Sequence, residues 1–576
     1  MNKKLFFVAL TGTICCTQPS CVQPKADLFF ENGVIYTADN NNTIVQALAV
    51  KDGWIVFTGS AEAGKPYKET AKEIIDLKGG MLLPGFIDGH IHTVTPAFFD
   101  FTLFVEKDAP SVLQTIETYI KANPNQEVYY GYGFNAGIFE GEELEKGPRK
   151  ERLDDLCPDK PVIIYALDGH SVWLNSKGFT YCNISKNTLP PVGGEIVKNN
   201  VTGELWGDVR NGAMALVPDP PLSPAKMTVV FQQFQALLNS LGYTSIMTLP
   251  GNGYMNVNWE GYHQLEAAGL LTLRVRGAAI VKPWSFQEDV AKLKALQKKY
   301  NSELVKITAA KLFADGIMTD KSAFLLQPYQ GGGQGVAIWS QDALNRAYAD
   351  LNKEGLQVHT HAIGDAAVKM ALDAAEYAKK TTADIDGRNV VTHLQLVDKN
   401  DFPRFKALHV IPVLQAFWHF KQPGAWEPIE YAVLGERAKT EYPLKSLADH
   451  GARLVFSSDY PVTNVPHPFY AVEIGVTRNL PDALAYGAPT EITDMDDPAY
   501  LLQPAERLDI MTMIKGYTAN AAFSIFEEHT TGTLEVGKSA DMVVIDQNLF
   551  AIDPLKISDT KVLSTYFKGK QVYQNQ

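Results

Sequence analysis

Residues Met81–Thr95 read MLLPGFIDGHIHTVT and decide the interpretation of the fold. An apolar run ends at Pro84-Gly85, a second short run follows, and His90 and His92 stand two residues apart. In an extended strand, residues i and i+2 point to the same face, so both imidazoles can reach one metal ion. Two solvent-facing histidines on a strand are the commoner meaning of an isolated HxH. The rest of the chain therefore has to decide between these two readings.

Composition describes an ordinary globular chain. It has 576 residues, of which 45% are hydrophobic and 20% charged, and its formal net charge is −13. This length predicts two or more domains. The negative charge argues against attraction to nucleic acid or to an anionic membrane surface. We therefore expect a small-molecule substrate.

The first residues resemble an export signal. Lys3 and Lys4 precede an apolar stretch from Leu5 to Cys16 that is too short to span a bilayer, and a polar segment follows. Residues 1–21 are therefore predicted to be a signal peptide. The mature protein would then be exported to the periplasm or the outer surface. The segment also resembles a lipoprotein signal in which Cys21 is lipidated, so a lipid anchor there is the predicted membrane contact. The alternative is cleavage near Val22 without lipid.

Two of the five cysteines, Cys157 and Cys182, lie outside this segment. They are either bonded to each other in an oxidising compartment or free and buried. Large barrels often pair, so a homodimer is a further hypothesis.

Short strand-like segments occur at both ends of the chain. Residues 26–83 alternate apolar and polar residues between turn signals such as Asp52-Gly53, and residues 530–576 show the same pattern of short strands and turns. We expect the two ends to form one small composite β-sandwich. Residues 84–529 would then be inserted into it.

The middle of the chain alternates strand-like and helix-like segments. Ser340 can cap a helix in which apolar residues recur at helical spacing, Gly355 can end it, and LQVHTHAIGD follows as a strand. Repeated units of this kind predict a parallel sheet, and at this length a (β/α)8 TIM barrel. The fold class is therefore α/β. Residues 84–529 are more than a typical barrel needs, so we expect an insertion around residues 98–224.

Polar residues end several of the apolar strands. In a (β/α)8 barrel the carboxyl ends of the strands build the active site, so these residues should converge. Imidazole nitrogens with a carboxylate suit zinc or a similar divalent metal. The candidate metal ligands are His90, His92, Lys311, His361, His393 and Asp459.

These segments resemble the metal-dependent amidohydrolase superfamily, in the branch called amidohydrolase family 3 or YtcJ-like. The resemblance runs from about Ala26 to the end and rests on PGFIDGHIHT, PVIIYALDGHSVWLNSKGF, KLFADG, VHTHAIGDAAV, VTHLQLV, FSSDYPV and GTLEVGKSADMVVID. It implies a first metal held by His90, His92 and Asp459 and a second held by His361 and His393. Lys311, if carboxylated on its amine, would bridge them. One metal per chain is the alternative.

The expected activity is hydrolysis of a non-peptide C–N bond in an amide, N-acyl group or cyclic amide. A metal-activated hydroxide would attack, with Asp459 as general base and then acid. His170 is expected to help position the substrate oxygen from the insertion. The expected substrate wall consists of Trp173, Gln415 and His467. The alternatives are an ester or phosphoester hydrolase on the same site and a non-catalytic barrel that only binds.

Overall fold

The computed structural model describes residues 25–93, 98–103, 106, 108–167, 169–191, 193–221, 223–251, 257–382, 385–463 and 465–575. The predicted signal at residues 1–21, with Cys21, lies outside these ranges. None of the helices within them is both long and apolar enough to cross a bilayer. Cys157 and Cys182 are both free and buried.

Eight parallel strands form the centre of the molecule. Each is hydrogen-bonded to the next in the order β21-β20-β19-β18-β17-β16-β15-β8. The strands are β8 (Phe86–Ile91), β15 (Tyr243–Thr248), β16 (Arg274–Ile280), β17 (Val305–Phe313), β18 (Gln357–Ala362), β19 (Val390–His393), β20 (Ile411–Leu414) and β21 (Val455–Phe456). The predicted TIM barrel is confirmed.

The barrel closes between its first and last strands. The backbone N–H of Asp459 donates to the carbonyl of His90 at 2.9 Å, and that of His92 donates to Tyr460 at 2.9 Å. A Cβ on Gly89 would come within 2.6 Å of Val455, so glycine allows β8 and β21 to approach. The seam therefore places the HxH segment directly beside Asp459.

Helices cover the barrel, and their ends follow local sequence signals. In α9 (Gln341–Lys353) the Ser340 hydroxyl accepts from the N–H of Ala343, and Leu344, Tyr348 and their apolar neighbours are buried. The chain leaves this helix through Gly355, which has φ +73°. The other helices around the barrel are α6 (Pro224–Ser240), α7 (Trp259–Ala267), α8 (Phe286–Tyr300), α10 (Asp365–Thr381), α11 (Phe402–Leu408), α12 (Ala432–Leu434), α13 (Leu444–Asp449), α14 (Pro468–Thr477), α15 (Ala483–Tyr486), α16 (Ile510–Tyr517) and α17 (Ala519–Ser524).

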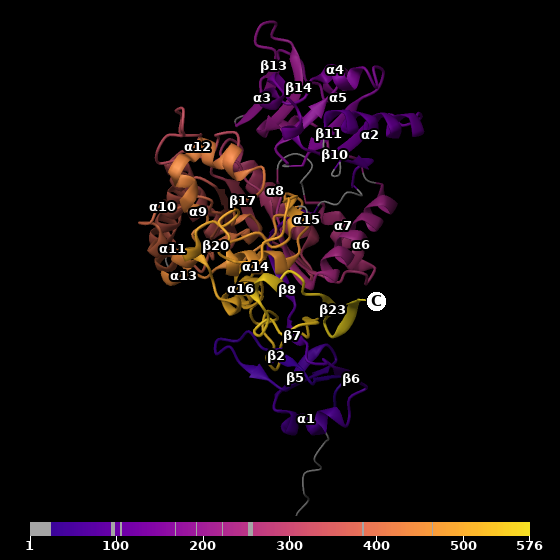
Figure 1. The fold of residues 1–576 in the computed structure, drawn as a ribbon, viewed down its shortest axis with the longest axis vertical. Helices are drawn as coiled ribbons and strands as arrows, with labels where there is room; N and C mark the ends of the chain where they lie inside the picture. Colours follow the sequence, from indigo (N-terminus) through magenta and orange to yellow (C-terminus); the bar gives the residue numbers. More distant parts are fainter. Residues whose placement is uncertain are drawn as a thin grey trace, which may run out of the picture.

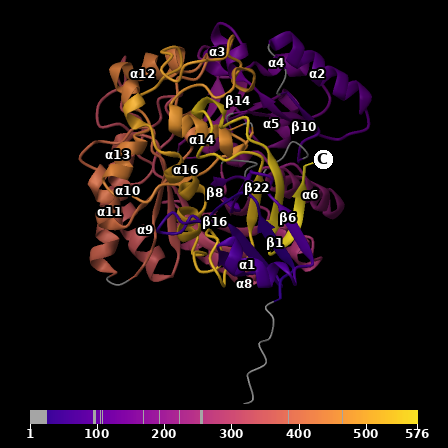
Figure 2. The same cartoon turned by 60° about the horizontal axis from the view of Figure 1, so that its bottom comes forward.

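The two chain ends share a pair of sheets with an apolar core between them, which includes Phe30, Leu82 and Met542. Strands from the start of the chain lie next to strands from its end, as Figure 2 shows in indigo and yellow. One sheet has the order β5-β4-β1-β6 and the other β24-β23-β22-β7-β2-β3. Asp52 and Gly53 both have positive φ at the bend between β4 and β5, as a tight hairpin requires. The strands are β1 (Leu28–Glu31), β2 (Val34–Tyr36), β3 (Ile44–Val45), β4 (Ala47–Lys51), β5 (Trp54–Gly59), β6 (Glu73–Asp76), β7 (Met81–Pro84), β22 (Met542–Ile545), β23 (Val562–Phe567) and β24 (Lys570–Gln574), with α1 (Ala61–Lys68) after β5.

Between β8 and β15 the chain forms a separate six-stranded sheet of its own, in the order β13-β14-β12-β11-β10-β9. In Figure 1 this insertion lies at one end of the molecule, the sheets of the chain ends lie at the other, and the barrel lies between them. Its elements are β9 (Phe101–Thr102), α2 (Ala109–Ala122), β10 (Tyr129–Phe134), α3 (Glu142–Lys146), α4 (Lys150–Asp154), β11 (Val162–Ala166), β12 (Ser171–Leu174), α5 (Ser176–Tyr181), β13 (Gly194–Lys198) and β14 (Leu205–Asn211).

Candidate metal centre

Three predicted ligands meet at the barrel seam. Oδ1 of Asp459 lies 3.1 Å from Nε2 of His90 and 3.1 Å from Nε2 of His92. One ligand atom from each residue falls within 4.8 Å of the others, and all three side chains are buried. Within the described part of the chain, Asp459 Oδ1 receives no hydrogen bond of good geometry. Buried ligand atoms that face one another without hydrogen bonding fit a shared cation.

The neighbours of both histidines direct Nε2 towards this point. The carbonyl of Leu249 lies 2.8 Å from Nδ1 of His92 and accepts its proton. Nδ1 of His90 lies 3.1 Å from Nε2 of His359 and 3.2 Å from the Thr392 hydroxyl. A ligand histidine commonly donates its other ring N–H to such a partner, which fixes the tautomer. Nε2 of each ring is then the unprotonated nitrogen that a metal requires.

Lys311 reaches the same point from β17. Its Nζ lies 3.5 Å from Nε2 of His90 and over the ring of Phe313, 5.0 Å from the centroid. Burial lowers the pKa of the Lys311 amine to about 7, against a partial opposing effect of the Asp459 charge. A large share of this amine is therefore neutral near pH 7.

His361 and His393 form a second pair in contact with the first. Their ring centroids are 4.5 Å apart, and that of His393 is 5.0 Å from that of His90. Nε2 of His361 faces the carbonyl of Gly316 at 3.0 Å, and Nδ1 of His393 faces Oε1 of Gln415 at 3.0 Å. Each ring is anchored through one nitrogen and has its other nitrogen for a ligand. All six candidate ligands thus lie at one mouth of the barrel.

The charge states of these residues suit a metal. Burial, with the Lys311 charge, lowers the pKa of His361 to about 3. Burial opposes ionisation of Asp459, but its contact with His92 holds the pKa of this carboxyl below its usual value. Neutral imidazoles beside an ionised carboxylate are the forms that bind a divalent cation.

Asp88 supports the seam from one layer deeper. Its Oδ1 accepts from the backbone N–H of His90 at 3.1 Å and from that of Ser458, 370 residues away in sequence, at 3.1 Å. Burial raises the pKa of Asp88 to about 7. Asp459 itself has φ +55°, a left-handed conformation that these contacts stabilise. Asp88 therefore fixes the ligand strand and the Asp459 turn together.

Sequence reasoning placed His359 one layer below His361 as a hydrogen-bonded core residue, and missed the roles of Asp88 and Thr392. Asp88 shares strand parity with His90, and that periodicity could have identified it as a supporting residue. Thr392 precedes His393 on a buried strand and carries no such signal.

The insertion brings His170 towards the barrel. The residue lies between β11 and β12, and its Nδ1 is 2.8 Å from Oδ1 of Asn211. Burial and the Lys311 charge are the main causes of the lowered pKa of His361, and His170 acts on it in the same direction. The structure thus connects His170 to Asn211, and its role at the metal centre stays a prediction.

The three residues expected to form the substrate wall lie elsewhere or have other contacts. Trp173 is fully buried in the core of the insertion, and its indole N–H donates to the carbonyl of Arg149 at 3.0 Å. Gln415 is fully buried and contacts His393 and, at 2.7 Å, the Ser457 hydroxyl. His467 lies before α14 with its ring stacked on Tyr470, 4.8 Å between centroids. These positions correct the expectation for Trp173, which packs in the core, and for Gln415, which orients His393.

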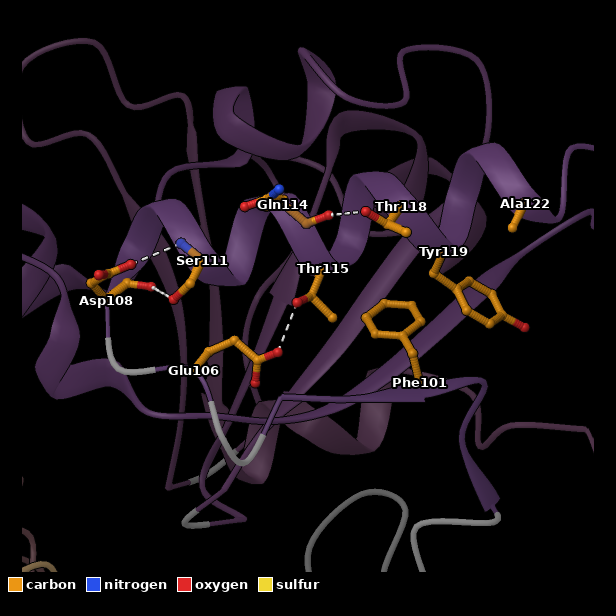
Figure 3. A pocket seen from close by; sticks show the side chains of 9 residues that line it. All are labelled: Phe101, Glu106, Asp108, Ser111, Gln114, Thr115, Thr118, Tyr119 and Ala122. Atoms are coloured by element: carbon orange, nitrogen blue, oxygen red, sulfur yellow. Dashed lines mark hydrogen bonds between the residues drawn. The ribbon is translucent and has the colours of Figure 1, made fainter.

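One hollow lies away from this centre. It has a volume of about 810 Å³ and runs along α2, with Phe101 and Tyr119 at one end and Asp108 at the other. Figure 3 shows Glu106 within it, where the carboxylate accepts from the Thr115 hydroxyl at 2.7 Å. None of the residues that line it is a candidate metal ligand. We therefore do not connect it with the chemistry of the centre.

Comparison with known proteins agrees with this geometry. The sequence model of the amidohydrolase family matches residues 73–573. YtcJ of Bacillus subtilis, described as an amidohydrolase, is 28% identical to this chain. The alignment covers 95% of this chain and 99% of YtcJ. The N-substituted formamide deformylase of Arthrobacter pascens is 22% identical over 95% of this chain and 98% of the deformylase. The crystal structure of a metal-dependent hydrolase from Pyrococcus horikoshii superimposes with a TM-score of 0.69 at 23% identity, over 92% of this chain and 99% of that one.

The chain belongs to the amidohydrolase family. Together with the His-His-Asp cluster at the barrel seam, this makes it a metal-dependent hydrolase.

Proposed function

We propose that this protein is a zinc-dependent hydrolase that cleaves the C–N bond of a small non-peptide amide, N-formyl or N-acyl compound or cyclic amide. One observation carries the proposal: the ionised carboxylate of Asp459 lies 3.1 Å from the Nε2 atoms of two buried histidines whose Nδ1 atoms have other partners. The relative from Arthrobacter pascens is an N-substituted formamide deformylase, which supports a formamide or related amide as the substrate class.

The metal would be held by His90, His92 and Asp459, with His361, His393 and Lys311 beside them. Nitrogen and carboxylate donors of this kind suit zinc. A bound divalent cation supplies a Lewis acid that acidifies water and polarises a carbonyl group. We infer that a second ion is held where Lys311 is carboxylated. The buried, largely neutral amine can react with carbon dioxide, and the carbamate then offers anionic oxygens where an ammonium would repel a cation.

Asp459 is the residue that moves the proton. Its carboxylate takes a proton from the attacking water and returns it to the leaving nitrogen, as one group does when it acts as general base and then as general acid. The Asp88 contacts hold the Asp459 turn in place, so the carboxylate needs no rearrangement between the two steps. His170, brought from the insertion, orients the substrate next to His361.

The test is hydrolysis of chromogenic substrates by the zinc-reconstituted protein. We expect turnover of para-nitroformanilide, and its loss in Asp459→Asn, which keeps the size of the side chain but cannot accept a proton. His529→Gln, at an exposed histidine, is the matched control and should retain full activity. If para-nitrophenyl acetate or bis(para-nitrophenyl) phosphate is cleaved and every amide is left intact, the ester or phosphoester alternative replaces the proposal.

Metal content distinguishes one ion from two. Lys311→Ala should reduce two equivalents of zinc per chain to one or none if a carboxylated lysine bridges the ions. One equivalent in both proteins would make the site mononuclear and Lys311 a structural residue. Bound metal without turnover of any substrate would support a barrel that only binds.

We also propose that the protein is exported and either lipidated at Cys21 or cleaved near Val22. The mass of the mature amino-terminal peptide tests this, because a diacylglyceryl cysteine and an unmodified terminus differ in mass. An intact Met1 would contradict both.

A further inference from the structure

Three polar side chains connect the insertion to the barrel. Nδ1 of His170 lies 2.8 Å from Oδ1 of Asn211, and Nδ2 of Asn211 donates to Oδ2 of Asp320 at 2.9 Å. His170 and Asn211 belong to the insertion, at the start of β12 and the end of β14. Asp320 lies in the barrel loop that follows β17, the strand that carries Lys311.

The chemistry of this chain allows one arrangement of protons. Asp320 is held in place because its other oxygen, Oδ1, accepts from the backbone N–H of Ser322 at 3.0 Å and also from the Ser322 hydroxyl. A carboxylate only accepts, so the NH₂ of Asn211 faces Asp320 and its carbonyl oxygen faces His170. That oxygen also only accepts, so Nδ1 of His170 carries the proton. In the neutral ring Nε2 is then the accepting nitrogen.

Asn211 occupies a backbone conformation that favours glycine. Its φ of 48° and ψ of −127° lie close to the first central position of a type II′ turn. An asparagine held there is under backbone strain. Its own N–H donates to the carbonyl of His170 at 2.9 Å, so the backbone joins the two residues as well. A strained side-chain-bearing residue, placed where glycine would fit better, indicates that the side chain is needed.

We propose that Asn211 and Asp320 are positioning residues that fix the orientation and tautomer of His170 and fasten the insertion to the barrel. The inference rests on the proposed function for the role of His170 in orienting substrate. Asn211 in the insertion and Asp320 in the barrel both act through His170. A carboxylate–amide–imidazole chain of this kind sets the geometry without touching the substrate.

The decisive variant is Asn211→Gly, which removes both side-chain hydrogen bonds and relieves the backbone strain. The melting temperature should stay the same or rise. The imidazole nitrogen shifts of His170 in NMR spectra, assigned by their loss in His170→Gln, should move from a single Nδ1–H form to a mixture of tautomers. With para-nitroformanilide as substrate, kcat should fall by about 10- to 100-fold, by analogy with the loss of partners that orient metal-binding histidines.

Asn183→Gly is the matched control. Asn183 is an exposed asparagine of the insertion that also has positive φ, at 56°. We expect the same relief of strain there, with unchanged His170 shifts and unchanged kcat.

Asp320→Ala tests the other end of the chain. The Asn211 amide would lose its anchor and could turn its NH₂ to His170, so the Nε2–H form should appear, and backbone hydrogen exchange in β14 should become faster. Unchanged His170 shifts in both Asn211→Gly and Asp320→Ala would overturn the proposal. The shifts and the exchange rates need no turnover, so they decide this inference even if para-nitroformanilide is not a substrate and the proposed function fails.

Discussion

The imidazole of His359 reaches the metal centre from one layer below it. Its Nε2 contacts Nδ1 of His90 at 3.1 Å, and for His90 to present an unprotonated Nε2 to a metal, His359 or Thr392 must accept the Nδ1 proton. We expect His359→Leu to weaken zinc binding by about 10- to 100-fold, as loss of such partners commonly does. Competition with a chelator measures the affinity.

His359→Gln keeps a hydrogen-bond acceptor at this depth and should recover much of the affinity. An equal loss in the Leu and Gln variants would show that His359 acts through its shape and not through the hydrogen bond.

At this scale the sequence predicted which residues converge but not what each contacts. His90, His92, His361, His393 and Asp459 could be found because each lies at or just beyond the carboxyl end of an apolar strand, which faces the barrel mouth. The contact of His359 with His90 spans 269 residues of sequence, so no local pattern encodes it. Trp173 was misjudged because an aromatic residue in a motif can serve either a core or a binding site, and burial decides between them.

Among the elements, α14 contains a buried acid. Glu473 is almost fully buried, accepts from the backbone N–H of Ser558 at 2.8 Å, and has its pKa raised by burial from 4.5 to about 8. The folded state therefore holds a proton that the unfolded chain loses above pH about 4.5. This contribution to stability is complete below that pH and is lost as the pH rises through about 8.

Glu473→Gln keeps the acceptor and removes the titration. We expect its melting temperature to exceed that of the native protein by an amount that grows between pH 4.5 and pH 8 and then levels off. A difference that does not change across this range would refute the assignment. Glu62→Gln, at an exposed glutamate, should show no such trend.

A buried ion pair joins β16 to the segment after α17. Nε of Arg276 donates to Oε1 of Glu527 at 2.9 Å, and both side chains are buried. Glu527→Gln leaves the Arg276 guanidinium without a compensating charge, which should cost about 3–5 kcal/mol of stability. The fall in melting temperature measures it.

Asp449→Asn breaks the exposed pair of Asp449 with Lys445 and provides the comparison. Exposed pairs contribute about 0–1 kcal/mol, so this change should have little effect. Equal falls in melting temperature in Glu527→Gln and Asp449→Asn would contradict the expectation that the buried pair matters more than the exposed one.

The barrel helices were predictable, whereas the sheet of the insertion was not. The cap at Ser340 and the glycine exit at Gly355 fixed α9 from local signals. The six strands of the insertion are short, and several pair with partners distant in sequence, as β12 does with β14. Local alternation of residues does not determine such pairing, and tertiary contacts decide it.

For the molecule as a whole, the candidate metal ligands lie on both sides of the barrel seam. His90 and His92 belong to the first barrel strand and its end, and Asp459 follows the last strand. A cation bound by these residues would join the two edges of the sheet. Removal of the metal should therefore lower the melting temperature and speed hydrogen exchange in β8 and the segment after β21 more than in the outer helices. A saturating ligand at 100 times its Kd contributes about 2.7 kcal/mol.

The same chelation experiment on His90→Asn provides the control. This variant should have the same melting temperature with and without chelator. If removal of the metal made hydrogen exchange faster to the same extent throughout the native protein, a metal located at the seam would be contradicted.

The most direct test of the central claim is the metal content of the purified protein after zinc reconstitution, beside a His90→Asn/His92→Asn double variant. We predict at least one equivalent of zinc per native chain and a loss of at least one equivalent in the double variant, because these two histidines and Asp459 converge on one point. No bound metal in the native protein, or an equal content in both proteins, would contradict the account.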